Sequence, residues 1–303
     1  MTRSDPQEGR TIRFRASDGH PLVGDLYCPA TPPVGAVLIA SALGVPRRYY
    51  APFGRYLAAG GLQALSFDYR GVGDSRPADL RGHPGRLQDW ADLDLPAAAR
   101  ELCSHAPGAP LLWLGHSVGG QLFGLVRGLE VRATLFVASH SVYWRGFPTL
   151  PGRLGVGVLY HGVIPLLTRA FGRLPMSTFG QGEDIPVGVA RQWAAWGRDP
   201  QYILGFARRE RGIDHFDYEG PMRFYAVEDD RYAPPRTVEA LYDFYPRARK
   251  ELVLVRARDL GVRKVGHFGP FRQTHRETLW PELRGWLLAR ARGAPLEEAR
   301  SSA

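Results

Sequence analysis

One serine between glycines stands out as the residue best placed for chemistry. Ser117 is the centre of the sequence GHSVG at positions 115–119, directly after the apolar run 110–114. This G-x-S-x-G pattern is typical of a nucleophile elbow, in which a strand turns sharply into a helix and exposes the serine hydroxyl. The glycines leave room for the turn, and the unpaired amides at the helix start favour negative charge. We therefore expect Ser117 to attack a carbonyl carbon.

A serine hydroxyl is a poor nucleophile until a base takes its proton, and the base needs an acid that orients it. In a fold with this elbow the chain order is serine, acid, histidine. Glu228, Asp229 and Asp230 follow the predicted strand 222–227, which is where the acid should lie. We choose Asp230 because the prolines at 234 and 235 mark the next helix. Asp229 is the alternative, and a third interpretation is that these acids only cap that helix.

The predicted base is His267, in the sequence VGHFGP at positions 265–270. It follows the last predicted strand and precedes the last predicted helix, and the glycines around it permit a tight loop. His116 neighbours the serine, but we expect the elbow to hold it pointing elsewhere. The other histidines have no comparable place in the chain order.

The negative oxygen of a tetrahedral intermediate needs two preorganised donors. The first should be the backbone N–H of Val118, the residue after the nucleophile. The second should come from the loop at 41–45, after the strand 34–40. We favour the amide of Ala42, with Leu43 as the next choice.

Strands and helices alternate around these residues, which indicates an α/β fold with a mostly parallel sheet between helices. The predicted strands are 11–14, 21–27, 34–40, 62–67, 110–114, 133–138, 222–227 and 251–256, and the predicted helices are about 48–59, 89–104, 121–127, 187–196, 235–244 and 274–290. Pro281 is an irregularity within the last helix.

The alternation stops at about 141 and resumes at about 216. Proline, glycine and aromatic residues are frequent in between, no strand is convincing, and short helices are expected. We therefore predict a hydrolytic core from 10–140 and 216–292, a helical cap from 141–215, and a frayed tail at 293–303. An insertion at this place lies over the carboxyl ends of the strands, where ligands bind in open α/β sheets.

Composition excludes several other classes of protein. The 303 residues are 44% hydrophobic, and the net charge of +9 comes from scattered arginines rather than a basic cluster, so we expect no nucleic-acid partner. Cys28 and Cys103 lie far apart, which predicts no disulfide and no metal site.

The longest apolar stretch, 155–167, is too short and too interrupted for stable membrane insertion. Residues 1–9 lack the apolar core of a signal peptide, so a cytoplasmic location is expected.

Together these residues resemble the α/β-hydrolase superfamily, over roughly 20–140 and 216–290. Besides the elbow, Asp230 and His267, the sequence DYRGVGDS at 68–75 resembles the D-x-R-G-x-G-x-S loop that supports the site in that superfamily. The chain looks most like the bacterial hydrolases akin to serine aminopeptidases and lysophospholipases. It departs from them in one place, because relatives often have His-Gly where this chain has Ala-Ser at 40–41, which leaves the path of the oxyanion loop open.

The resemblance implies an α/β-hydrolase fold and a serine hydrolase that needs no cofactor and no metal. We expect cleavage of a carboxylic ester (EC 3.1.1) with a small to medium apolar acyl group, through an acyl-enzyme. An aminopeptidase or amidase, or an acyltransferase with the same triad, remains an alternative. So does a non-catalytic module that binds small molecules and retains a vestigial triad. The leaving group and the oligomeric state are not determined by the sequence.

Overall fold

The computed structural model describes residues 9–180 and 182–295. The predicted absence of a signal peptide at residues 1–9 and most of the predicted tail at 293–303 concern residues outside these ranges. The described helix Leu150–Phe171 is long and apolar enough to cross a membrane, by length and composition alone.

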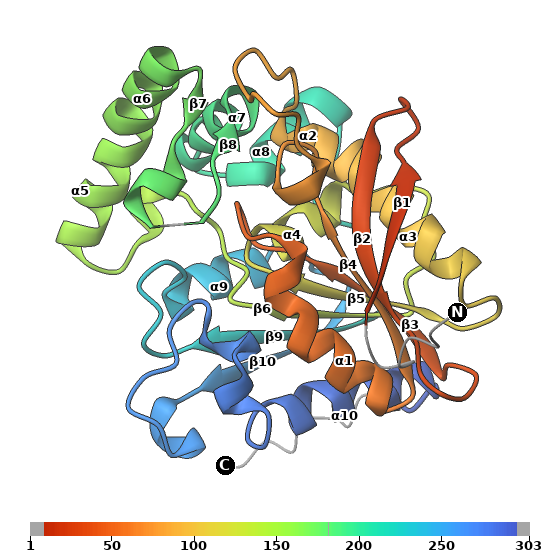
Figure 1. Cartoon of the computed structure of the whole chain (residues 1–303). Helices are drawn as coiled ribbons and strands as arrows, with labels where there is room; N and C mark the ends of the chain where they lie inside the picture. The colour runs from red at the N-terminus through yellow and green to blue at the C-terminus, as the bar shows by residue number, and fades with distance from the viewer. Residues whose placement is uncertain (1–8, 181, 296–303) are drawn as a thin grey trace.

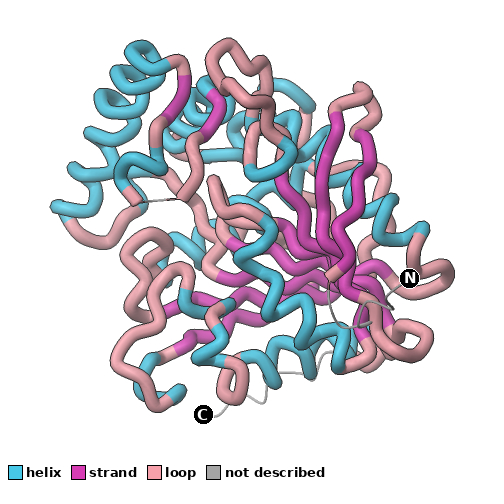
Figure 2. Tube along the Cα trace, in the orientation of Figure 1, coloured by secondary structure: helices cyan, strands magenta, loops and turns pink. Residues whose placement is uncertain are grey.

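A single eight-stranded sheet forms the centre of the molecule, in the order β1-β2-β4-β3-β5-β6-β9-β10 (Figures 1 and 2). The strands are β1 Arg10–Arg15, β2 Pro21–Tyr27, β3 Gly35–Ala40, β4 Leu62–Asp68, β5 Leu111–His116, β6 Ala133–Val137, β9 Pro221–Val227 and β10 Arg249–Val255. Only the pairs β1–β2 and β2–β4 of this sheet are antiparallel, and the other five pairs are parallel. Every residue of β3, β4, β5 and β6 is buried, as expected for parallel strands covered on both faces. The predicted α/β fold with a mostly parallel sheet is confirmed.

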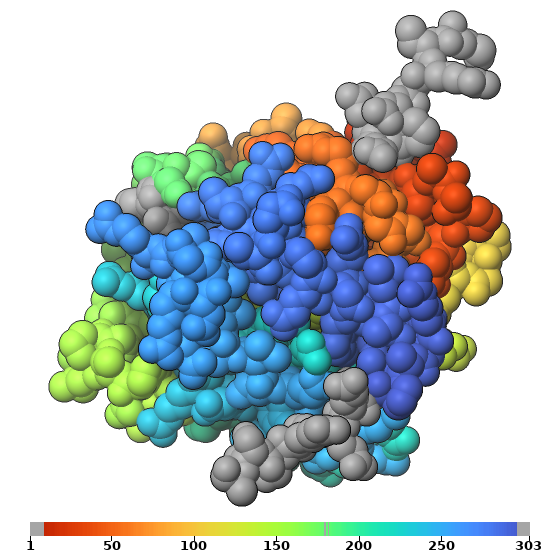
Figure 3. Space-filling view, turned by 90° about the horizontal axis from the view of Figure 1, so that it is seen from below, coloured from red at the N-terminus to blue at the C-terminus, as the bar shows by residue number. Residues whose placement is uncertain are grey.

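Helices cover both faces of this sheet. The helices of the core are α1 Ala51–Ala59, α2 Leu87–Asp89, α3 Leu95–Ser104, α4 Val118–Gln121, α9 Pro235–Tyr242 and α10 Trp280–Ala291. The first and last of them, α1 and α10, lie together on one face, and Figure 3 shows the orange and blue segments adjoining on that side. On the opposite face lie α3 and α9.

Residues from 141 to 215 form a helical layer at the upper left of Figure 1, beside the sheet. Its elements are α5 Leu150–Val158, α6 Ile164–Phe171, α7 Val187–Arg198 and α8 Tyr202–Arg211, with the two-residue strands β7 Arg173–Leu174 and β8 Ile185–Pro186. We call this layer the cap. The short helices expected here are present, and the segment, in whose sequence no strand is convincing, also contains one small antiparallel pair, β7 with β8.

Two predicted helices differ in extent from the observed ones. The last helix begins at Trp280, so Pro281 occupies its first turn, where the missing N–H costs nothing. The helix after the elbow is shorter than predicted, because the α-helical turn α4 passes into a 3₁₀ turn at Leu122–Leu125.

Candidate active site

The elbow places Ser117 between the central strand β5 and helix α4. Its backbone has φ 52° and ψ −116°, a conformation that L-residues rarely adopt and that is found where function requires it. A Cβ at Gly119 would lie 2.0 Å from the Ala40 carbonyl oxygen, and one at Gly115 would lie 2.5 Å from the Cα of Gly120. The glycines of the motif are therefore required by close backbone contacts around the turn.

Asp230 and His267 are brought together at the ends of two loops. The His267 ring donates a hydrogen bond from Nδ1 to Asp230 Oδ2 at 2.6 Å, and the acceptor carboxylate is fully buried. The other oxygen, Oδ1, accepts the amides of Tyr232 at 2.8 Å and Ala233 at 3.0 Å. Burial acts to raise the pKa of the Asp230 carboxyl, but the hydrogen bond and charge of His267 outweigh it and lower the pKa. Asp230 thus stays ionised and fixes the tautomer of the ring.

Asp229, the alternative acid, has a different task. Its carboxylate accepts the amides of Val265 at 2.9 Å and Gly266 at 2.7 Å, and so holds the loop that carries His267. It does not touch the imidazole in any hydrogen bond among the described residues. The geometry therefore favours Asp230 as the orienting acid and leaves Asp229 as a support for the loop.

We expect Asp229→Asn to lower stability more than turnover. The amide group presents a donor to one of two backbone N–H groups, which leaves that N–H unpaired at a cost of about 1–3 kcal/mol. Urea unfolding should show this loss, while kcat for a soluble ester should fall no more than about tenfold, because the His267–Asp230 contact survives. A kcat loss as large as that of an Asp230 variant would contradict this division of roles.

Ser117 and His267 line the same pocket, which has a volume of about 150 Å³. The hydrogen bonds among the described residues include none between the serine hydroxyl and the ring, a situation that is common before substrate binds. The wall is mostly apolar, and the cap contributes six of its fourteen residues, Phe147, Val156, Leu159, Tyr160, Met176 and Trp193. Ser117 itself is 7% exposed, so a substrate must enter this pocket to reach it.

The loop after β3 changes the expected choice of oxyanion donor. The Ala42 amide donates to the Tyr50 hydroxyl at 2.9 Å and so is already engaged, contrary to the preference for Ala42. Leu43 lines the pocket beside Ser117, and its amide has no acceptor among the described residues. Val118 begins α4, where the first amides lack intrahelical partners. The structure therefore favours Leu43 and Val118 as the pair of donors.

A relay of hydrogen bonds joins the oxyanion loop to the histidine loop, and the sequence did not reveal it. The Tyr50 hydroxyl that accepts the Ala42 amide lies 2.8 Å from His116 Nδ1 and donates to it. The His116 Nε2–H then donates to the backbone oxygen of His267 at 3.0 Å. Burial, and then the charge of His267, lowers the pKa of His116 to about 3, so the ring is neutral. His116 thus points away from the pocket, as expected, and supports its two sides.

A second buried histidine faces the candidate site from the end of β6. His140 lines the pocket, and its ring centroid lies 6.2 Å from that of His267. Its Nδ1 is 3.4 Å from the Gln121 amide, whose Oε1 accepts the hydroxyl of Tyr202 from the cap at 2.6 Å. Burial, and then the charge of His267, lowers the pKa of His140 to about 3.

The two buried histidines should make the fold sensitive to mild acid. Their pKa values are lower in the folded chain, about 3, than the ordinary 6.5, so the unfolded chain binds more protons between these limits. The neutral rings make their full contribution to the free energy of unfolding above pH 6.5. This contribution is lost as the pH falls from 6.5 towards 3, and at pH 5 the loss is about 2 kcal/mol for each ring.

Chemical unfolding at pH 7 and pH 5 measures this difference directly. The free energy of unfolding should be lower at pH 5 than at pH 7, and we expect His140→Gln to make this difference smaller by about 2 kcal/mol. The control is His105, an exposed residue directly after the end of α3, and His105→Gln should leave this loss of unfolding free energy unchanged. An unaltered loss in the His140 variant would contradict burial of a neutral ring.

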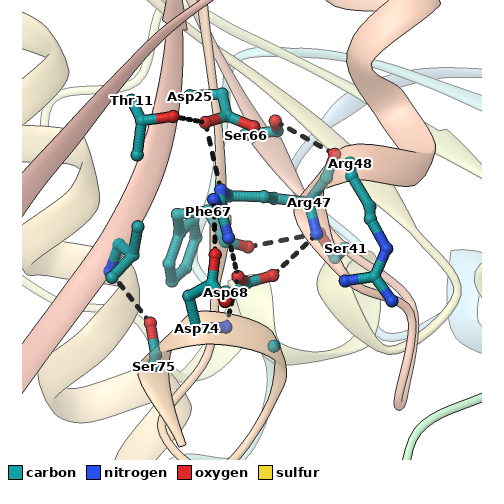
Figure 4. A network of polar contacts seen from close by, with 12 residues as sticks. Thr11, Asp25, Ser41, Arg47, Arg48, Ser66, Phe67, Asp68, Asp74 and Ser75 are labelled. Atoms are coloured by element: carbon teal, nitrogen blue, oxygen red, sulfur yellow. Dashed lines mark hydrogen bonds and ion pairs between the residues drawn. The ribbon is translucent and has the colours of Figure 1, made fainter.

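The D-x-R-G-x-G-x-S loop contacts the loop after β3 through the polar network drawn in Figure 4, and none of its residues lines the pocket that holds Ser117. Asp68 accepts the amide of Arg47 at 2.7 Å and that of Asp74 at 3.0 Å, and it also pairs with the Arg47 guanidinium. The same guanidinium lies 3.1 Å from Asp25 and 2.8 Å from Asp74. Because Arg47 ends the loop that contains Leu43, this buried network fixes where that loop leaves the sheet.

No group of three or more His, Cys, Asp or Glu side chains that could hold a metal ion occurs in ranges 9–180 and 182–295. Cys28 and Cys103 are both free thiols in the structure.

A family model described as "Serine aminopeptidase, S33" matches residues 31–133. This segment contains the oxyanion loop, the D-x-R-G-x-G-x-S loop and the elbow, whereas Asp230 and His267 lie outside it. A search of curated proteins finds no match.

Solved structures resemble nearly the whole chain. One is the complex of DcsB with its substrate analogue, at 15% identity and a TM-score of 0.64, covering 94% of this chain and 99% of that one. A soluble variant of monoglyceride lipase from Saccharomyces cerevisiae, in complex with a substrate analog, is 18% identical with a TM-score of 0.62, covering 95% and 96%. The Pyrococcus furiosus esterase PF2001 is 15% identical with a TM-score of 0.56, covering 97% and 95%. At these identities the likeness concerns the fold.

Proposed function

We propose that this chain is a serine hydrolase of the α/β-hydrolase superfamily and that it cleaves carboxylic esters. The observation that carries the proposal is the pairing of His267 with the buried Asp230 at the wall of the pocket that holds Ser117. This is the arrangement of acid, base and nucleophile that acyl transfer requires.

In the proposed mechanism His267 Nε2 takes the proton of Ser117 as its oxygen attacks the ester carbonyl. Asp230 stabilises the imidazolium that forms, and the Leu43 and Val118 amides bind the negative oxygen. Collapse of this intermediate expels the alcohol, which takes the proton from His267, and leaves an acyl-enzyme. Water then attacks the acyl group with His267 as base, which releases the acid and restores the serine.

The pocket supports a short, apolar acyl group. A cavity of about 150 Å³ is the size that accommodates a molecule such as benzene. The cap supplies aromatic and aliphatic walls, which favour an acyl chain over a polar residue. We therefore expect butyrate-like or hexanoate-like esters to fit better than long-chain ones.

Aminopeptidase activity is the second candidate, because the matching family model carries that description. A free amino terminus needs a carboxylate near the scissile bond, and no acidic side chain lines the described pocket. The adjacent cap acids Glu183 and Asp184 are engaged elsewhere. Glu183 accepts from Arg48 and the Gly73 amide, and Asp184 accepts from Arg173 and Ser177. These contacts favour the ester over the peptide.

A panel of chromogenic substrates tests this choice. We expect p-nitrophenyl butyrate to have a kcat/KM at least about tenfold above p-nitrophenyl palmitate, since even one extra methylene in an apolar pocket changes the transition-state free energy by about 1–3 kcal/mol. Aminoacyl p-nitroanilides should be turned over more slowly still. Rapid release of p-nitroaniline without hydrolysis of any ester would overturn the ester assignment in favour of the aminopeptidase.

A further inference from the structure

The outer helix of the cap carries an unusual set of exposed apolar side chains. Helices α5 and α6 are joined by a π-helical turn at Leu159–Val163 into one continuous helix. Large apolar side chains that are 37% to 67% exposed follow one side of it. We call this set the cap stripe, and it consists of Leu150, Leu154, Val158, Val163, Leu166 and Phe171. Figure 1 shows α5 and α6 at the outer edge of the molecule, which agrees with the exposure of the stripe.

The opposite side of the same helix is fixed to the rest of the cap. Gly157, Tyr160, Ile164 and Thr168 are buried at helical spacing. The Tyr160 ring packs at 5.1 Å against Trp193 of α7. This side also lines the pocket, through residues that include Val156 and Leu159. One helix therefore forms a wall of the candidate site on one side and presents the cap stripe on the other.

The helix is built to lie on a surface rather than to cross a bilayer. The helix is long and apolar enough for a span, yet its inner side is buried in the fold at Tyr160, Ile164 and Thr168. Crossing a membrane would require the inner side to leave α7 and the pocket, whereas docking by the outer side leaves these contacts intact. An apolar helix face that lies along the surface can enter the boundary between headgroups and acyl chains.

Charge around the cap stripe indicates what it binds. No Asp or Glu occurs between Glu130 and Glu183, a segment that includes the whole helix. Arg145 precedes the helix, Arg153 lies in its first turn, and Arg169 lies in its last turn. These three arginines form no ion pair among the described residues, in contrast to Arg173, which pairs with Asp184. Positive charge without compensation beside apolar side chains is complementary to anionic lipid headgroups over an apolar interior.

We propose that the cap stripe docks this protein on membranes that contain anionic phospholipids. The apolar side chains enter the boundary between headgroups and acyl chains, and Arg145, Arg153 and Arg169 bind the phosphates. Docking in this way involves no stable insertion. It places the pocket beside the layer into which esters with apolar acyl groups partition. A second copy of this chain is a poorer occupant, because two stripes face to face would bring the same unpaired arginines together without carboxylates.

Sedimentation with vesicles tests the proposal on the full chain. The protein carries Ser117→Ala, so that binding is measured without turnover and does not depend on the proposed function. We expect it to bind vesicles of phosphatidylcholine with about 30 mol% phosphatidylglycerol, and to bind less in about 0.5 M salt, because the headgroup attraction is screened. Failure to bind these vesicles at low salt would overturn the proposal.

The exposed positions of the stripe provide a sharper comparison. Leu154→Gln with Leu166→Gln should lower the partition coefficient at least about tenfold, because two leucine side chains no longer leave water. Leu252 is an exposed leucine on β10, remote from the cap, and Leu252→Gln should bind as the parent does. Equal binding by the double variant would assign the interaction elsewhere and overturn the proposal.

Two further readouts separate this inference from its competitors. In protein that retains the native Ser117, the double variant Leu154→Gln with Leu166→Gln should hydrolyse a water-soluble ester at the parental rate, since neither leucine lines the pocket. In size-exclusion chromatography the parent protein and the double variant should elute at the same volume, because the stripe does not hold two copies together. A dimer that the double substitution abolishes, with no vesicle binding, would identify the stripe as an interface between copies and refute membrane docking.

Discussion

Ser117→Ala is expected to reduce kcat for p-nitrophenyl butyrate by about 10⁴–10⁶-fold while the protein stays folded. In the proposed mechanism the hydroxyl forms the bond to the acyl carbon, and alanine offers no atom to replace it. The substitution should not disturb the elbow, because the backbone conformation is set by close contacts at Gly115 and Gly119. Initial rates with the butyrate ester, together with thermal unfolding, measure both expectations.

Ser139 is the matched control for this substitution. It is fully buried beneath the elbow, and its hydroxyl donates to the Gly115 oxygen at 3.3 Å, but it does not line the pocket. Ser139→Ala should therefore retain kcat within about tenfold. Retained turnover in the Ser117 variant would show that another group is the nucleophile, and equal losses in both variants would point to damage of the turn.

The second large effect is expected for Asp230→Asn, with kcat falling about 10³–10⁴-fold. Asp230 Oδ1 accepts two backbone amides, from Tyr232 and Ala233, and these keep an oxygen at that position after the substitution. The amide NH₂ then faces His267 Nδ1, where the native carboxylate accepts a proton. The ring must take the other tautomer, with a proton on Nε2, and can no longer accept the proton of the serine.

A double variant distinguishes this explanation from general damage. Groups that act as one unit lose activity in a non-additive way, so Ser117→Ala with Asp230→Asn should be no slower than Ser117→Ala alone. Multiplied losses would mean that Asp230 acts independently of the serine. Asp229→Asn serves as the neighbouring control, since its carboxylate contacts backbone amides instead of the ring.

Much of the fold could be predicted because its strands are buried on both sides. Strands such as β3 and β4 have apolar runs with no polar alternation, and the turns around them are marked by glycine. The elbow could be predicted for a related reason, because a serine between two glycines at the end of such a strand has few other structural explanations. Position in the chain then selected His267 among nine histidines.

The details that could not be predicted depend on contacts between distant segments. Nothing near Ala42 in the sequence shows that its amide meets Tyr50, so the choice between Ala42 and Leu43 required the structure. The same is true of Asp229 and Asp230, whose roles differ only in which loop atom each carboxylate reaches. The relay through His116 joins residues that are 66 and 151 positions apart, which no local pattern encodes.

The cap illustrates a different limit. Its apolar stretch at 155–167 is shorter than a membrane span, but that comparison assumes that all sides of a helix face lipid. The structure shows a longer helix with one buried side and one exposed side, and this difference follows from packing against α7. Surface docking becomes an option only when the two sides are known.

The central claim is that Ser117 is activated by His267 and Asp230, and covalent labelling with a fluorophosphonate tests it most directly. An activated serine attacks the phosphorus, whereas an ordinary serine does not react. We predict that one probe attaches to the full chain on the peptide that contains Ser117, and that Ser117→Ala and His267→Ala remain unlabelled. An unlabelled native protein, or a Ser117→Ala variant that still takes the probe, would contradict the account.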